Sequence, residues 1–252
     1  MSQNECKSIF YKGHNGRGLL LIHGFTGTPL DMGPLAEFFR GIGFAISIPL
    51  LAGHGTSPEH LRKTTWKDWL RSAEEGYHQL RLSGAESIYM IGLSMGGLLG
   101  LKLAIDHPFK AMATLNTPIF VHDKRIKYVR YLKWIIPYVQ RTEKKPPHIE
   151  QHLKPYIRTP LASLQQLYEL IESVKADLPS IETPIFIAQA GSDETVQPSS
   201  ADYIYDYIGS NYKKVRHYPK STHIITRDHD CYQLNRDIAA YFEHIRQELE
   251  GG

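Results

Sequence analysis

A serine lies between two glycines in the middle of an apolar stretch. Residues 88–98 have the sequence IYMIGLSMGGL, in which Gly92 and Gly96 flank Ser94 at a spacing of two. An apolar strand, a Gly-x-Ser-x-Gly turn and a helix form the arrangement that projects a serine Oγ from a tight turn, and the glycines let neighbouring backbones approach. The N-terminus of the following helix offers unpaired N–H groups to developing negative charge. The pattern predicts Ser94 as a nucleophile; the alternative is an ordinary glycine-rich turn.

A nucleophilic serine needs a base, and the base needs an acid that orients it. In an open parallel sheet these groups are expected in loops beyond the carboxyl ends of later strands. Asp193 follows a predicted strand at 184–190, and His223 follows another at 213–218. We therefore predict Asp193 as the acid and His223 as the base. The competing residues for these roles are Glu194, His217 and His229.

Two backbone N–H groups are expected to stabilise the oxyanion of the reaction. One belongs to Met95, the residue after the nucleophile, and the other to the loop after an early strand. The apolar segment 19–22 leads into His23-Gly24-Phe25-Thr26-Gly27, so Phe25 is the second candidate. His23 closes a buried strand, and we interpret it as a hydrogen-bonded structural residue rather than a catalytic one.

Short apolar segments alternate with helical patterns along most of the chain. Segments without period-two alternation are typical of strands buried on both faces of a parallel sheet. The sequence predicts an α/β fold with helices on both faces of a mostly parallel sheet. A hairpin before residues 14–16 is a further expectation. The predicted strands are 19–22, 44–48, 88–91, 111–115, 185–188 and 213–218, and the predicted helices are 35–42, 64–82, 98–105 and 234–245.

The positive charge of the chain is concentrated in one segment. The 252 residues contain 29 Lys and Arg against 26 Asp and Glu, a net charge of +3. Residues 118–160 hold ten of the bases and three of the acids, which makes this segment +7 and leaves the remainder at −4. We predict an α/β core at 1–117 and 179–252, interrupted by a small helical cap at 118–178. The ten bases are Lys124, Arg125, Lys127, Arg130, Lys133, Arg141, Lys144, Lys145, Lys154 and Arg158, and Trp134 is among the aromatics between them.

The composition of the chain and its lack of certain motifs limit the cellular locations and the classes of partner that are expected. With 42% hydrophobic and 22% charged residues, the chain is neither disordered nor collagen-like. The start, MSQNECK, lacks a signal-peptide apolar stretch, and Cys6 and Cys231 do not form a disulfide framework, so a cytoplasmic location is expected. No motif for a metal or a cofactor is found, and neither is expected. The basic cap matches no nucleic-acid-binding module; peripheral contact with a lipid surface is the weaker alternative to a solvated face.

Three glycine-containing motifs, together with the Asp193 and His223 segments, carry a resemblance to a known family. The motifs are His23-Gly24-Phe25-Thr26-Gly27, Gly53-His54-Gly55-Thr56-Ser57 and Gly92-Leu93-Ser94-Met95-Gly96-Gly97. The chain resembles the bacterial carboxylesterase and monoacylglycerol lipase branch of the α/β-hydrolase superfamily over essentially its whole length. The resemblance implies a compact sheet core, a helical cap and cofactor-free ester hydrolysis. It carries Ser94, Asp193 and His223 over as the triad, and Phe25 and Met95 as oxyanion donors.

One residue departs from the family pattern. Thr222 stands where the family usually has a glycine before the histidine. A β-branched residue does not readily adopt a positive φ, so we expect the base loop to have a different shape here.

The predicted function is hydrolysis of esters with short to medium acyl chains, including monoacylglycerols, through an acyl-enzyme on Ser94. A peptidase or amidase of the same fold is the closest alternative, and a non-hydrolytic binding protein is the alternative from another class. Apolar cap residues are candidates for the wall of an acyl pocket or for the core of the cap itself. They are Ile119, Phe120, Ile135, Ile136, Leu164, Leu167 and Ile171.

Overall fold

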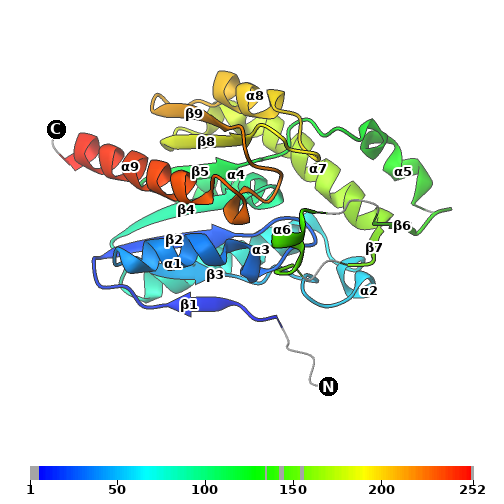
Figure 1. Ribbon diagram of the computed structural model, residues 1–252, viewed down its shortest axis with the longest axis horizontal. Helices are drawn as coiled ribbons and strands as arrows, with labels where there is room; N and C mark the ends of the chain where they lie inside the picture. The colour runs from blue at the N-terminus through cyan, green and yellow to red at the C-terminus, as the bar shows by residue number, and fades with distance from the viewer. Residues whose placement is uncertain (1–5, 134, 142–144, 154–155, 251–252) are drawn as a thin grey trace.

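A seven-stranded sheet runs through the centre of the computed structural model, which describes residues 6–133, 135–141, 145–153 and 156–250 (Figure 1). The strands lie in the order β1-β3-β2-β4-β5-β8-β9; β1 is antiparallel to β3, and the other neighbours are parallel. This arrangement confirms the predicted fold class. The strands are β1 (Ile9–Tyr11), β2 (Arg17–Ile22), β3 (Ala45–Ile48), β4 (Ser87–Leu93), β5 (Met112–Leu115), β8 (Ile185–Ala190) and β9 (Lys213–Tyr218).

Both faces of this sheet are covered by helices, which explains the largely apolar sequence of its inner strands. In β2, Leu20 and Ile22 pack into the cluster beneath α3, α4 and α7, whereas Leu19 and Leu21 pack into the cluster beneath α1 and α9. All four side chains are fully buried. The helices on the two faces are α3 (Trp66–Leu82), α4 (Met95–Asp106), α7 (Leu161–Asp177) and α8 (Ser199–Tyr207) on one, and α1 (Gly33–Gly41) and α9 (Cys231–Glu250) on the other.

The predicted opening hairpin is wrong. β1 pairs with β3 rather than with β2, the next strand along the chain. The reason is that β3 and β4 occupy both edges of β2, so that the outer edge of β3 is the one that β1 joins. The loop between β1 and β2 is held near the start of β3, because the backbone N–H groups of His14 and Asn15 both donate to the carbonyl of Gly43.

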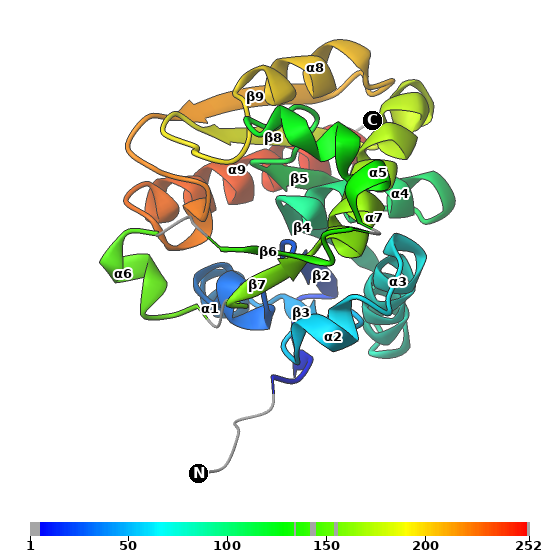
Figure 2. The ribbon, with the colours of Figure 1, turned by 90° about the vertical axis from the view of Figure 1, so that its right-hand side faces the viewer.

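The segment between β5 and β8 leaves the sheet at its carboxyl end, and its described residues before α7 lie beyond the ends of the central strands (Figure 2). It holds helices and also a small antiparallel sheet, a feature that the sequence patterns did not predict. Its long helix α7 packs against α4 and contributes Leu170 and Val174 to the core. The other elements of the segment are η2 (Lys124–Tyr128), α5 (Val129–Leu132), β6 (Tyr138–Gln140), α6 (Pro147–Glu150), β7 (Arg158–Pro160) and η3 (Leu178–Ser180). Trp134, Lys144 and Lys154 lie outside the described residues.

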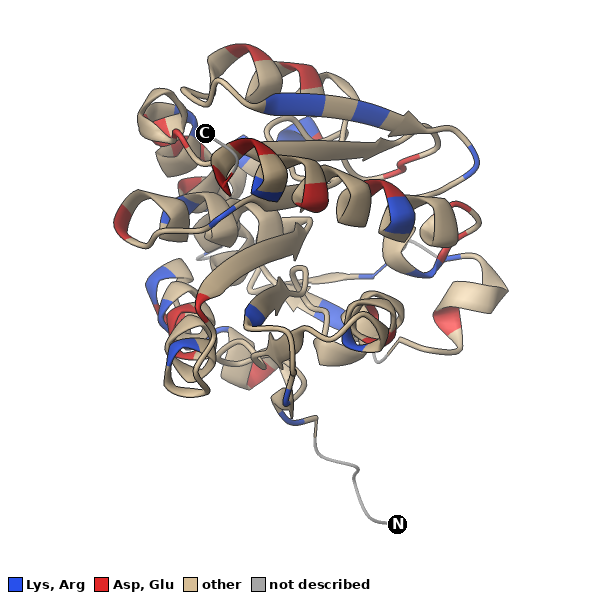
Figure 3. Ribbon diagram, turned by 90° about the vertical axis from the view of Figure 1, so that its left-hand side faces the viewer, with Lys and Arg blue, Asp and Glu red and all other residues tan. Residues whose placement is uncertain are grey.

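Basic residues of this segment are joined to acids of the remaining chain. Arg158 forms an ion pair with Glu59, and Lys145 forms another with Glu194. On the opposite side of the molecule, acidic and basic residues are interspersed along α9, and basic residues lie along β9 (Figure 3). None of the helices in the described part of the chain combines the length and the apolar character of a bilayer span.

Candidate active site

Ser94 occupies a sharp turn between β4 and α4. Its backbone has φ 54° and ψ −121°, a conformation that side chains with a Cβ rarely adopt. The turn is tightly packed, because a Cβ on Gly92 would lie 2.3 Å from the Gly96 carbonyl oxygen and a Cβ on Gly96 would lie 2.1 Å from that of Ile22. These contacts exclude side chains at both glycines. The Gly-x-Ser-x-Gly pattern is therefore needed for this turn to form.

The side chain of Ser94 ends a line of hydrogen-bonded groups. Its Oγ lies 3.0 Å from Nε2 of His223, and Nδ1 of the same ring lies 2.9 Å and 3.0 Å from the two carboxylate oxygens of Asp193. All three residues are buried, with exposed fractions of 6–8%. The structure thus brings together the serine, the acid and the base that the sequence analysis selected.

The carboxylate of Asp193 is held in its charged form. Burial alone raises its pKa, but the charge and hydrogen bond of His223 and the N–H groups of Val196 and Thr195 outweigh burial, so that the pKa of Asp193 is lowered. Both N–H groups donate to Oδ1 at 2.8 Å. A carboxylate held in this way fixes an N–H on Nδ1 and leaves Nε2 to accept the serine proton.

The competing residues lie elsewhere. Glu194, the alternative acid, accepts a hydrogen bond from the backbone N–H of His223 at 3.1 Å, and it also pairs with Lys145. It therefore holds the main chain of His223 rather than its ring. His217 is exposed on β9, and His229 is exposed beside Asp228.

The loop before His223 is anchored by Asp228. One oxygen of this carboxylate accepts from both the N–H and the hydroxyl of Thr222, at 2.8 Å and 2.6 Å. The other oxygen lies 3.0 Å from Nε2 of His148, which belongs to α6. Burial raises the pKa of Asp228, but the Thr222 bonds outweigh it and lower the pKa. Thr222 does not adopt a positive φ, and its hydroxyl is used, so a glycine is not required at this position.

Asn116 joins the loops that carry the acid and the base, and the sequence analysis missed it. It follows β5, is fully buried and has φ 47°. Its Nδ2 donates to the carbonyl oxygen of His223 at 2.8 Å, and its Oδ1 accepts from the N–H of Ala190 at 2.7 Å. The sequence signal that could have identified Asn116 is its position directly after a central strand, because the three predicted site residues also follow the carboxyl ends of strands.

The loop after β2 lies against Ser94. A Cβ on Gly24 would be 3.3 Å from that of Ser94, which brings the segment with Phe25 to the same place as the turn with Met95. His23 has the bonds of a structural residue: Nδ1 pairs with the Gly24 carbonyl at 2.9 Å, and Nε2 accepts from the N–H of Leu51 at 3.2 Å. Burial lowers the pKa of His23 to about 3, so the ring is neutral.

The apolar residues that the sequence analysis predicted for the cap lie in different environments. Ile119, Leu167 and Ile171 are buried in the core cluster beneath α7, whereas Ile135 and Ile136 are exposed. An open hollow of about 270 Å³ lies between η2 and α7. Ile119, Phe120, Ile126 and Ile171 are among the residues that line it.

Comparison with known proteins shows the family of the chain. Residues 14–230 match the model of the family described as serine aminopeptidase, S33. The chain is 31% identical over 239 residues to a carboxylesterase of Bacillus subtilis (strain 168), covering 95% of this chain and 97% of the relative. It is 37% identical over 243 residues to a thermostable monoacylglycerol lipase of Bacillus sp. (strain H-257), covering 93% and 94%.

Solved structures agree with this result. A structure from work on LipS and LipT, two metagenome-derived lipolytic enzymes, matches with a TM-score of 0.88 and 25% identity, covering 96% of this chain and 98% of that one. The monoacylglycerol lipase of Paleococcus ferrophilus has the same fold, with a TM-score of 0.79 at 16% identity, covering 94% and 98%. The chain therefore belongs to the serine aminopeptidase S33 family of α/β-hydrolases.

Proposed function

We propose that the chain hydrolyses carboxylic esters of short to medium acyl chains, including monoacylglycerols, through an acyl-enzyme on Ser94. The observation that carries this proposal is the buried hydrogen-bonded line from Ser94 through His223 to Asp193. Two curated relatives that cover nearly the whole chain, one a carboxylesterase and one a monoacylglycerol lipase, support ester hydrolysis.

In the proposed mechanism, Nε2 of His223 takes the hydroxyl proton of Ser94 while Oγ attacks the ester carbonyl carbon. The N–H groups of Phe25 and Met95 stabilise the oxyanion, each contributing about 2.7–4 kcal/mol in comparable sites. Protonated His223 then donates to the departing alcohol as the bond between acyl carbon and alcohol oxygen breaks. Water, deprotonated by the same nitrogen, releases the acid and regenerates Ser94. Asp193 orients the ring and offsets its positive charge.

We also propose that residues 118–178 form a lid over this site. The lid contacts the catalytic loops, since Lys145 pairs with Glu194 and His148 with Asp228. Apolar side chains of this segment, including Phe120 beside the hollow near α7, are the proposed wall of the acyl pocket. Peripheral contact with a lipid surface through the basic residues of the lid is part of this proposal.

A peptidase remains the alternative because the family is described as a serine aminopeptidase. Both reactions use the same three groups, and they differ in the leaving group that His223 must protonate. The substrate itself therefore has to distinguish them.

The test uses p-nitrophenyl esters of increasing chain length beside amino-acyl p-nitroanilides, together with a fluorophosphonate that labels activated serines. We expect ester turnover that is highest at short to medium chains and a single adduct on Ser94. Ser94→Ala should lose the adduct and nearly all turnover, whereas Ser180→Ala, at an exposed serine, should keep both. Preferred cleavage of the anilides would exclude the esterase proposal, and labelling of another serine would exclude the role of Ser94.

A further inference from the structure

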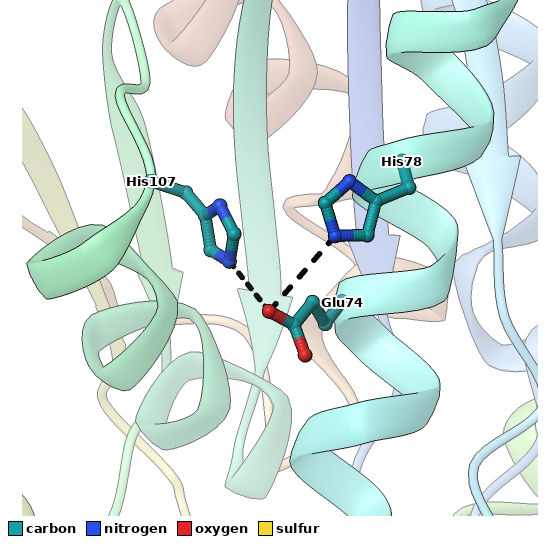
Figure 4. A group of neighbouring side chains, drawn as sticks. All are labelled: Glu74, His78 and His107. Carbon is teal, nitrogen blue, oxygen red and sulfur yellow. Dashed lines mark hydrogen bonds and ion pairs between the residues drawn. The ribbon is translucent and has the colours of Figure 1, made fainter.

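Two histidines and a glutamate converge on one point between α3 and the end of α4 (Figure 4). Glu74 and His78 are four residues apart on α3, so they lie on the same side of that helix. His107 is the residue that ends α4. Nε2 of His107 lies 2.9 Å from Oε1 of Glu74, and Nε2 of His78 lies 3.9 Å from the same oxygen.

The distances between these three atoms approach those of a metal site. Donors bound at about 2.0–2.1 Å in tetrahedral geometry are separated by roughly 3.4 Å. The two measured distances lie on either side of this value, and all three atoms are within 4.8 Å of one another. The donor atoms are therefore close enough together for a single ion to reach all three.

The site is partly preorganised. The ring of His107 lies against the ring of Tyr77, with centroids 4.6 Å apart, and the Tyr77 ring contacts that of Phe109 at 5.3 Å. Tyr77 is buried, so the orientation of His107 is fixed by the core. The side chain of His78 is 57% exposed, which gives an ion access from solvent and leaves room for water as a further ligand.

We infer that Glu74, His78 and His107 form a binding site for a divalent transition-metal ion of borderline softness, such as Zn²⁺. Two imidazoles and one carboxylate are the donors that such ions prefer, whereas Ca²⁺ and Mg²⁺ prefer oxygen atoms alone. The site lies at the end of the sheet remote from catalysis, because α4 begins directly after Ser94 and its 12 residues span about 18 Å before His107. An ion here would link α3 to α4 and stabilise the fold without taking part in the reaction.

A second group of potential ligands is less suitable. His148, Asp228 and His229 also lie close together, but the Asp228 carboxylate already accepts three hydrogen bonds. These bonds come from the N–H and hydroxyl of Thr222 and from the N–H of His229. Metal binding there would compete with the anchoring of the base loop. This group therefore provides the matched control.

The experiment measures Zn²⁺ binding by the full chain without an affinity tag, by competition with a chromophoric chelator. Thermal unfolding is followed in parallel, and Co²⁺ replaces Zn²⁺ for visible spectra. We expect one equivalent bound at this site and a rise in Tm of about 3–6 °C at free Zn²⁺ ten times the Kd. The Co²⁺ spectrum should show the intense absorption of a tetrahedral ion. His78→Gln and Glu74→Gln should each weaken binding at least tenfold and remove the Tm shift.

The control variant His229→Gln should retain the binding at this site, the Tm shift and the Co²⁺ spectrum. The inference is overturned if Zn²⁺ does not bind at millimolar concentration, or if binding is unchanged in His78→Gln and Glu74→Gln. Loss of this binding in His229→Gln alone would assign it to the other group and equally overturn the inference. Because these readouts do not depend on turnover, their failure is distinguishable from failure of the proposed function.

Discussion

The backbone of Ser94 makes a prediction about stability that is separate from catalysis. With φ 54° and ψ −121°, this residue is in a region where a Cβ is strained. Strain of this kind costs about 1–3 kcal/mol. Ser94→Gly removes the strained Cβ, whereas Ser94→Ala keeps it, and both variants lose the same hydrogen bond to His223. The comparison of the two therefore isolates the strain.

The expected magnitude follows from two opposing contributions. Glycine relieves the strain but loses about 0.4–1 kcal/mol through the greater freedom of the unfolded chain. We expect the free energy of unfolding of Ser94→Gly to exceed that of Ser94→Ala by about 1 kcal/mol, which corresponds to roughly 2–4 °C in Tm. Under the proposed function both variants are inactive, so the difference between them reports on stability alone.

Urea unfolding of the two variants, each measured beside the wild type, tests this prediction. Ser87, at the start of the same strand, provides the control because it does not have a positive φ. There, glycine should be less stable than alanine by about 0.5–1 kcal/mol, the reverse order. An alanine variant at position 94 that is as stable as the glycine variant would refute the argument from strain.

Three further predictions concern single side chains. Burial raises the pKa of Asp31 to about 6, above its value in the unfolded chain. Ionisation of Asp31 therefore destabilises the fold as the pH rises from 4 to 7. Over this range the free energy of unfolding of Asp31→Asn, measured with urea, should rise by about 2–3 kcal/mol relative to that of the wild type. Thr222→Val keeps the N–H bond to Asp228 but loses the hydroxyl bond, so it should lower both kcat and the free energy of unfolding, the latter by about 1–3 kcal/mol, whereas Thr222→Ser should retain both. Asp193→Asn should reduce kcat by about 10⁴, measured with the best ester, because the ring of His223 then adopts the wrong tautomer.

The elements that the sequence predicted well are those with strong local patterns. The strand before Ser94 and the strands before Asp193 and His223 are apolar or bounded by turn residues. Because these strands are parallel, their carboxyl ends lie at the same end of the sheet. The predicted hairpin failed because β1 is only three residues long, and its partner is chosen by which sheet edge is open. That choice depends on tertiary packing rather than on local sequence.

The residues that sequence reasoning missed have no motif of their own. Asn116 and Asp228 are single polar residues whose importance comes from partners more than 70 positions away or from a loop that folds back on itself. The group at Glu74, His78 and His107 is similar, because only the packing of α3 against α4 brings residues 29 positions apart to one point. The sequence analysis did not identify this group, because the spacing of Glu74 and His78 does not reveal its third member.

The last four strands of the sheet lie in the order β4-β5-β8-β9, which keeps the residues of the site apart from the segment 118–178. Each strand delivers one residue at its carboxyl end: Ser94, Asn116, Asp193 and His223, in that order. The whole segment from 118 to 178 enters and leaves between the second and third of them. If residues 118–178 form the proposed lid, insertions, deletions and sequence drift within that segment alter which substrates are admitted, while backbone hydrogen bonds between neighbouring strands keep the four residues in register. Selectivity can evolve in this architecture without rebuilding the chemistry.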